Sequence, residues 1–65
     1  MLRKAFLINE DWMKTFGYEG MDNRVAVRRF DLNSRTVLVD NPADPKFGKQ
    51  LTISIDRGRF VQVGL

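Results

Sequence analysis

Cysteine and histidine are both absent from this chain of 65 residues. Without cysteine there is no disulfide bond and no thiolate metal site. Without histidine the chain lacks the usual zinc ligand and the usual general base of an enzyme. No nucleophile is therefore accompanied by a histidine base, and no glycine-rich phosphate loop is present. These absences predict a protein that is not an enzyme and that uses no metal or cofactor.

The acidic residues do not supply the missing chemistry. Glu10 and Asp11 are neighbours in an expected helix, where they point in different directions and are interpreted as first-turn partners of the helix dipole. Asp40 and Asp44 beside Asn41 resemble part of a calcium loop. The nearby prolines and the missing bidentate glutamate at loop position 12 favour a turn-forming role instead.

Long hydrophobic runs are missing as well. The AFLI run of residues 5–8 is too short for a signal peptide or a membrane span, so we expect no membrane association and a cytoplasmic location. An apolar fraction of 43% fits a folded domain. The length predicts a single domain over residues 1–65 with a thin core, because a chain of this size buries only roughly 60% of its unfolded surface.

The clearest pattern that is present lies in residues 51–65, LTISIDRGRFVQVGL, which predict a β-hairpin. A loop of two residues at 57–58 would set apolar side chains opposite polar ones. A loop of three residues at 56–58 sets Ile53 opposite Val61 and gives one apolar face. It also places Gly58 third in the loop, where a left-handed residue is needed.

This register also assigns the faces of the hairpin. Leu51, Ile53, Val61 and Val63 are expected on the inner face. Phe60 falls on the other, less apolar face, where its neighbours are small or polar: Thr52, Ser54 and Gln62.

A short helix is predicted over residues 10–16. Asn9 is a suitable N-cap and Gly17 stands where the helix stops. Trp12 and Phe16 lie four residues apart on one face. Because two turns are too few to be stable alone, we expect these two aromatic side chains to dock on the sheet as core residues.

Residues 24–40 predict a second hairpin, whose register has two solutions. A three-residue loop at 32–34 pairs Val27 with Val39. In that loop Asn33 or Ser34 would take the positive-φ position, which asparagine tolerates more readily.

The alternative is a four-residue loop at 32–35. It pairs Phe30 with Val37 and Arg28 with Val39. The sequence does not choose between the two registers, although both keep Arg24, Arg28 and Phe30 alternating on one face.

A strand over residues 2–9 completes the set, and the proline-containing loop 40–50 links the two hairpins. Phe47, the only aromatic residue of that loop, is expected to plug the sheet edge. The expected order is β-α-β-β-loop-β-β. We predict a mainly β fold (α+β by its short helix) that forms a small five-stranded twisted sheet or a partly open barrel. The rival is an open four- or five-stranded sheet completed by dimerisation.

The functional prediction rests on basic and aromatic residues. The net charge is +3, and arginine, the better ligand of phosphates and base edges, outnumbers lysine. Arginine side chains neutralise phosphates, and exposed aromatic rings stack bases for roughly 1–3 kcal/mol each. A small non-catalytic domain that binds DNA or RNA is therefore favoured. Its predicted binding residues come from the two hairpins: Arg24, Arg28, Arg29, Phe30, Arg35, Arg57, Arg59 and Phe60.

The alternative is a protein-interaction or regulatory module that acts through strand edges or a homodimer seam. Phe30 and Phe60 also have a structural interpretation, as a second layer of the core covered by the Trp12–Phe16 helix. The arginines would then keep a solvated β-surface soluble.

Overall fold

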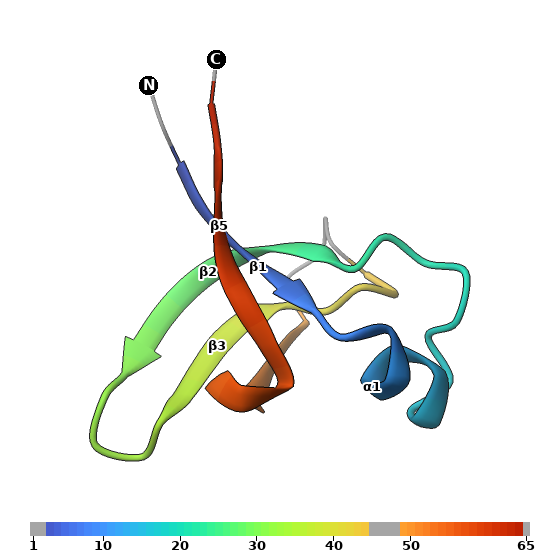
Figure 1. Cartoon of the computed structure of the whole chain (residues 1–65), viewed down its shortest axis with the longest axis horizontal. Coiled ribbons are helices and arrows are strands. Elements are labelled where there is room, and N and C mark those ends of the chain that lie inside the picture. The colour runs from blue at the N-terminus through green and yellow to red at the C-terminus, as the bar shows by residue number, and fades with distance from the viewer. Residues whose placement is uncertain (1–2, 45–48, 65) are drawn as a thin grey trace.

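The computed structural model describes residues 3–44 and 49–64, and Figure 1 shows its course. Within these residues the elements are β1 (Arg3–Ile8), α1 (Glu10–Thr15), β2 (Arg24–Asp31), β3 (Thr36–Asp40), β4 (Gln50–Ser54), the 3-10 turn η1 (Ile55–Arg57) and β5 (Gly58–Val63). This succession confirms the predicted mainly β fold with one short helix. Phe47, the residue expected to plug the sheet edge, lies outside the described residues.

The five strands form one antiparallel sheet in the order β4-β3-β2-β1-β5. β4 and β5 are its two edges, so the described part of the sheet does not close into a barrel. β2 is the longest strand, and its first part pairs with β1 while its last part pairs with β3. The sheet bends along β2, so the half that contains β1 and β5 faces the half that contains β3 and β4 (Figure 1).

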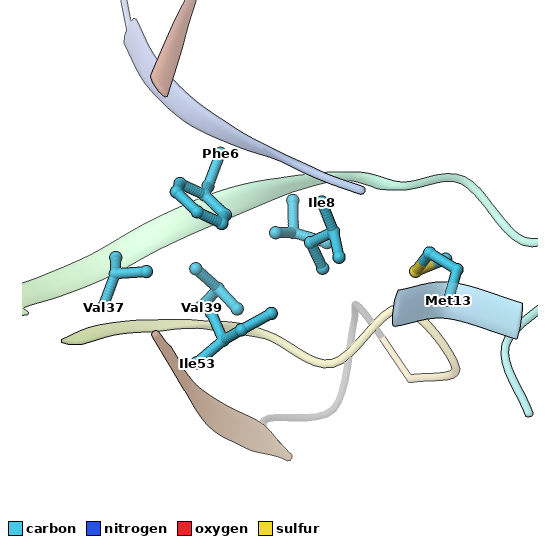
Figure 2. Close-up of a cluster of buried hydrophobic side chains, with 7 residues drawn as sticks. Phe6, Ile8, Met13, Val37, Val39 and Ile53 are labelled. Carbon is cyan, nitrogen blue, oxygen red and sulfur yellow. The ribbon is translucent and has the colours of Figure 1, made fainter. Parts of the chain in front are cut away.

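The core lies between these two halves. It consists of Phe6, Ile8, Met13, Val25, Val37, Val39 and Ile53. Phe6 and Val37 are completely buried, and Figure 2 shows Met13 at the opposite end of the cluster from Val37. Each buried side chain of this size contributes about 1.5–3 kcal/mol relative to exposure. The side of the sheet that carries this cluster is called the core face below, and the opposite side the outer face.

The C-terminal hairpin predicted from residues 51–65 is wrong. β4 and β5 lie at opposite edges of the sheet, and β5 pairs with β1 over six positions, from Arg3 opposite Val63 to Ile8 opposite Gly58. Phe60 lies opposite Phe6 and therefore on the core face. The predicted placement of Phe60 on the less apolar face is thus wrong too.

The predicted inner face of the two strands is correct only for β4. Leu51 and Ile53 lie opposite Val39 and Val37 on the core face. Val61 instead lies opposite Ala5 on the outer face, and Val63 follows it there by alternation.

The turn η1 explains why these strands do not form a hairpin. The Ile55 N–H donates to the carbonyl of Arg35 (3.0 Å), and the Asn9 N–H donates to the carbonyl of Arg57 (2.8 Å). These bonds anchor the segment to the β2–β3 turn and to the end of β1. The chain therefore crosses from β4 to β1 instead of reversing on β4. Alternation in a sequence predicts which residues share a face, but it does not identify the partner strand.

The β2–β3 hairpin combines the two registers that its sequence allowed. Asp31 pairs with Thr36 and Phe30 with Val37, so the loop has the four residues 32–35. Further along, Val27 pairs with Val39, as the shorter loop would require. An irregularity between Val27 and Arg29 reconciles the two, because Arg28 is an extra residue on β2. The positive φ belongs to Arg35 (57°) and not to Asn33 or Ser34.

The helix forms at the predicted place, but it docks through a different residue. Met13 is almost completely buried, Trp12 is partly buried against the core, and Phe16 is 59% exposed. The prediction that both Trp12 and Phe16 are core residues is therefore wrong for Phe16. A helix of two turns is so short that only one of its side chains can lie at the centre of its contact with the sheet, and this side chain is Met13. No helix in the described part of the chain is long and apolar enough to cross a membrane.

Gly58 gives the first testable prediction. Its φ of 179° is extended, so the left-handed role expected from the sequence is wrong. A Cβ at this position would collide with the backbone carbonyl oxygen of Leu7 and stand 2.6 Å from the Phe6 ring. We expect Gly58→Ala to destabilise the domain by about 2 kcal/mol and to lower Tm by roughly 10 °C, measured by thermal unfolding.

Gly20→Ala is the matched control. Gly20 has a φ of +87° and open space around it, so only the backbone cost of about 1 kcal/mol applies. Equal losses in the two variants would contradict the close approach of β5 to Phe6.

Candidate nucleic-acid interface

The outer face of the sheet gathers arginines from different strands. Leu7 of β1 lies opposite Arg24 of β2 on one side and opposite Arg59 of β5 on the other. Directly opposed residues in antiparallel strands project to the same face. The two arginines therefore flank Leu7 about 10 Å apart, two strand spacings, and both are exposed.

Two further arginines extend this row. Arg3 shares the face of Leu7 by alternation along β1. Arg29 lies opposite Leu38, which alternates with the buried Val37 and Val39 and so faces outward. Both arginines are exposed. Strand β2 thus carries cations toward both of its ends, and β1 and β5 add one each. The outer-face arginines, as the term is used below, are Arg3, Arg24, Arg29 and Arg59.

The floor of the outer face beside these arginines is apolar. Ala5, Ala26 and Val61 form the next row across β1, β2 and β5. Small side chains there let the longer arginines reach past them, and Ala5 is buried although it is on the outer face. The outer face therefore presents the guanidinium groups of the arginines beside a surface with few side-chain hydrogen-bonding groups.

Arg28 also points to the outer face, but a carboxylate holds it. Its Nε and Nη2 donate to Oδ1 and Oδ2 of Asp40, both at 2.7 Å. Arg28 is half exposed, whereas the side chain of Asp40 is 10% exposed. The two hydrogen bonds from Arg28 lower the pKa of Asp40 below its ordinary value, and they raise that of Arg28. This pair neutralises a carboxylate that would otherwise weaken the positive face.

Asp31 is another carboxylate near this face, and it is turned to the β2–β3 loop. Its Oδ1 accepts hydrogen bonds from the backbone N–H groups of Asn33 (3.0 Å) and Ser34 (3.3 Å). The bond from Ser34 is the main cause of a lowered pKa for Asp31. Asp31 thus stabilises the turn.

The two phenylalanines of the predicted site meet, but on the core face. Their rings pack edge to face at 5.5 Å, and Phe60 makes a similar contact with the buried Phe6 at 5.2 Å. Phe30 is 46% and Phe60 is 37% exposed. They lie at the Val37 end of the core, opposite the end that Met13 of α1 closes, so the prediction that the helix covers them is wrong. Lys4 stands over the Phe60 ring at 5.8 Å.

The remaining predicted arginines belong to a third location. Arg35 lies in the β2–β3 turn and Arg57 in η1, and both act electrostatically on Asp56. The Ser54 hydroxyl donates to Asp56 at 2.6 Å and is the main cause of the lowered pKa of that carboxyl. These two arginines are close to a carboxylate and are not part of the outer-face row.

The sequence interpretation therefore predicted one surface, whereas the structure distributes its residues over three locations. Arg24 and Arg59 flank Leu7, Arg29 shares the outer face five residues further along β2, and Phe30 and Phe60 lie on the core face. Arg3 was missed, although alternation along the strand predicted at residues 2–9 puts it on one face with Ala5 and Leu7.

No family model, curated protein or solved structure matches this chain. Among residues 3–44 and 49–64, no group of three or more acidic side chains is arranged to hold a metal ion. The interpretation of the outer face therefore rests on its own geometry and charge.

The Arg28–Asp40 pair gives a prediction for the pH dependence of stability. Because the pKa of Asp40 is lowered in the folded state, the contribution of the pair is present above the unfolded carboxyl pKa of about 3.9. It is lost as pH falls through the lower folded value. In urea unfolding, we expect Asp40→Asn to be less stable than the natural chain at pH 7. The difference should shrink progressively below about pH 4.

Asp44→Asn is the control, because the Asp44 carboxylate forms no hydrogen bond or ion pair with the described residues. A stability difference for Asp40→Asn that stays constant from pH 7 to pH 2 would show that the ion pair is not its origin.

Proposed function

We propose that this chain is a small, non-catalytic domain that binds nucleic acid through the phosphate backbone, with the outer-face arginines as its contacts. The observation that carries the proposal is the gathering of four exposed arginines, from three strands, on one face of the sheet. Arginine is well suited to phosphate because its planar guanidinium offers several donors in a fixed geometry. The proposal places the domain in the cytoplasm, where a chain without cysteine needs no oxidising compartment.

The ion pair of Arg28 supports this assignment. Asp40 shares the outer face with the arginines, and an unpaired carboxylate there would repel a phosphate chain. Two short hydrogen bonds from Arg28 offset that charge locally. Arg28 consequently acts by holding Asp40, and it is not counted among the phosphate ligands.

The apolar floor supports binding that does not depend on sequence. Base identity is read through hydrogen bonds to base edges, and the floor residues Ala5, Leu7, Ala26 and Val61 offer no polar side-chain atoms. Phe30 and Phe60 are on the core face, so stacking of bases on them is left out of the proposal. Four phosphate contacts correspond to a slope of log Kobs against log salt concentration of about −3 to −4.

Arg24→Gln tests the proposal. We expect it to weaken binding of a labelled DNA or RNA of about 15 nucleotides several-fold at low salt, and to reduce the magnitude of the salt slope by about 1. Fluorescence anisotropy across a salt series, with single strands and duplexes, measures both. The matched control is Lys14→Gln, which removes the same charge from the exposed surface of α1.

Equal losses for Arg24→Gln and Lys14→Gln would mean that only net charge matters, and the outer face would not be the site. Binding that is weak and unchanged between low and physiological salt would exclude the function itself.

A second candidate function is pairing with a protein partner at the edge of the sheet. Strand β4 is an edge, and its sequence from Gln50 to Ser54 contains no charged residue and no proline. Natural edge strands usually carry such groups to prevent pairing. The geometry supports this function less than the first, because most of the charge of the chain would then have no role.

This second function predicts a dimer or a complex that persists at high salt. Thr52 is exposed in the middle of β4, and Thr52→Lys would place a charge on the edge. We expect the variant to shift sedimentation toward the monomer while the circular dichroism spectrum stays unchanged. A natural chain that is monomeric at every concentration and salt excludes self-pairing.

A further inference from the structure

An exposed aromatic stack lies on the segment that connects β1 to β2. Trp12 stacks on Phe16 with ring centroids 4.5 Å apart and 26° between the planes. It also stacks on Tyr18 at 5.8 Å and 19°. Phe16 is 59% exposed, the most exposed aromatic residue among those described, so part of its ring has no intramolecular neighbour. These three residues are called the aromatic stack below.

The backbone fixes this stack in place. Phe16 is the C-cap of α1 and follows Trp12 by four residues, which brings their rings together. Gly17 then adopts a left-handed φ of +85° and reverses the chain. The reversal lets the Tyr18 N–H donate to the carbonyl of Met13 at 2.7 Å, and Tyr18 returns beside Trp12. The rings are therefore held in their arrangement without a partner.

The charge around the stack is opposite to that of the rest of the chain. Residues 9–23 contain one lysine and four carboxylates, a net charge of −3, although the whole chain carries +3. The carboxylates are Glu10, Asp11, Glu19 and Asp22, all exposed and none in an ion pair with the described residues. Phosphates would be repelled here, whereas a cation would be attracted.

The stack packs on the other face of the sheet from the outer-face arginines, although Arg24 follows the acidic segment directly along the chain. Met13 of α1 belongs to the core cluster, so the helix packs at the core face, at one end of the sheet. A ligand on the stack and a phosphate chain on the outer face would not compete for the same side chains.

We propose that the aromatic stack docks an arginine-bearing segment of a partner protein. A guanidinium group stacks on the face of an aromatic ring, an attraction of about 0.5–2 kcal/mol per contact depending on exposure. The nearby carboxylates supply charge complementarity and steer the cation to the rings. The rings are already ordered, so little conformational entropy is lost on binding.

Trp12 is the single tryptophan of the chain, so its fluorescence reports directly on the stack. An amidated hexa-arginine peptide is the probe. We expect a saturable change in Trp12 emission, although protein and peptide both carry net positive charge. Hexaglutamate and oligothymidylate should give no such change. A response to oligothymidylate would instead identify the stack as a platform for bases and would overturn the proposal.

Two sets of variants separate the contributions. Phe16→Ala and Phe16→Leu should each weaken hexa-arginine binding about tenfold, since leucine keeps apolar bulk but has no aromatic face. Leu32→Ala, which truncates an exposed apolar side chain elsewhere, should leave binding unchanged. Full affinity in Phe16→Leu would contradict stacking of the guanidinium on the ring.

The double variant Glu10→Gln with Glu19→Gln tests the carboxylates. It should also weaken binding of the hexa-arginine peptide several-fold. Asp44→Asn is the control. Neither set should alter nucleic-acid affinity beyond the effect of net charge. Because the readouts use different ligands, failure of the peptide to bind would leave the nucleic-acid proposal standing, and the reverse also holds.

Discussion

The fold depends on the central burial of Phe6. Among the described residues, its strand, β1, is the one strand with which β5 pairs. The Phe6 ring is completely buried, contacts the Phe60 ring, and lies so close to Gly58 that no side chain fits there. The outer-face row follows from the same register, because Arg24 and Arg59 flank Leu7 only when Phe6 is opposite Val25 and Phe60.

The sequence allowed the elements to be predicted better than their partners. Alternation and turn residues correctly indicated five strands, a helix after Asn9 and a turn between β2 and β3. The β4–β5 hairpin failed for a non-local reason. Pairing Ile53 with Val61 gives a consistent apolar face, but β5 pairs with β1 instead. Phe60 there contacts the completely buried ring of Phe6, a partner distant in sequence that the local pattern cannot reveal.

The candidate site was predicted only in part, and a single extra residue accounts for much of the difference. Strict alternation along β2 placed Arg28 and Phe30 on one face. The bulge at Arg28 reverses the alternation, so Phe30 turns to the core face while Arg28 stays outside and meets Asp40. Bulges leave a weak signal in a sequence. Here the signal was the conflict between the two hairpin registers, each of which was correct on one side of Arg28.

The acidic surroundings of the aromatic stack are not apparent from the charge of the whole chain or of its two halves. A mild net charge of +3 hides a basic sheet and an acidic connection of residues 9–23. If the charges are counted separately for each predicted element, with the helix and the loop after it taken together, the acidic connection is distinguished from the basic sheet. Trp12 was correctly associated with the helix, but a hydrophobic ring was assumed to need burial. With Met13 anchoring α1 in the core, Phe16 is not required there. The exposed part of its ring is the surface that the proposed docking site uses. The opposite charges of the two surfaces mean that each favours a ligand that the other repels.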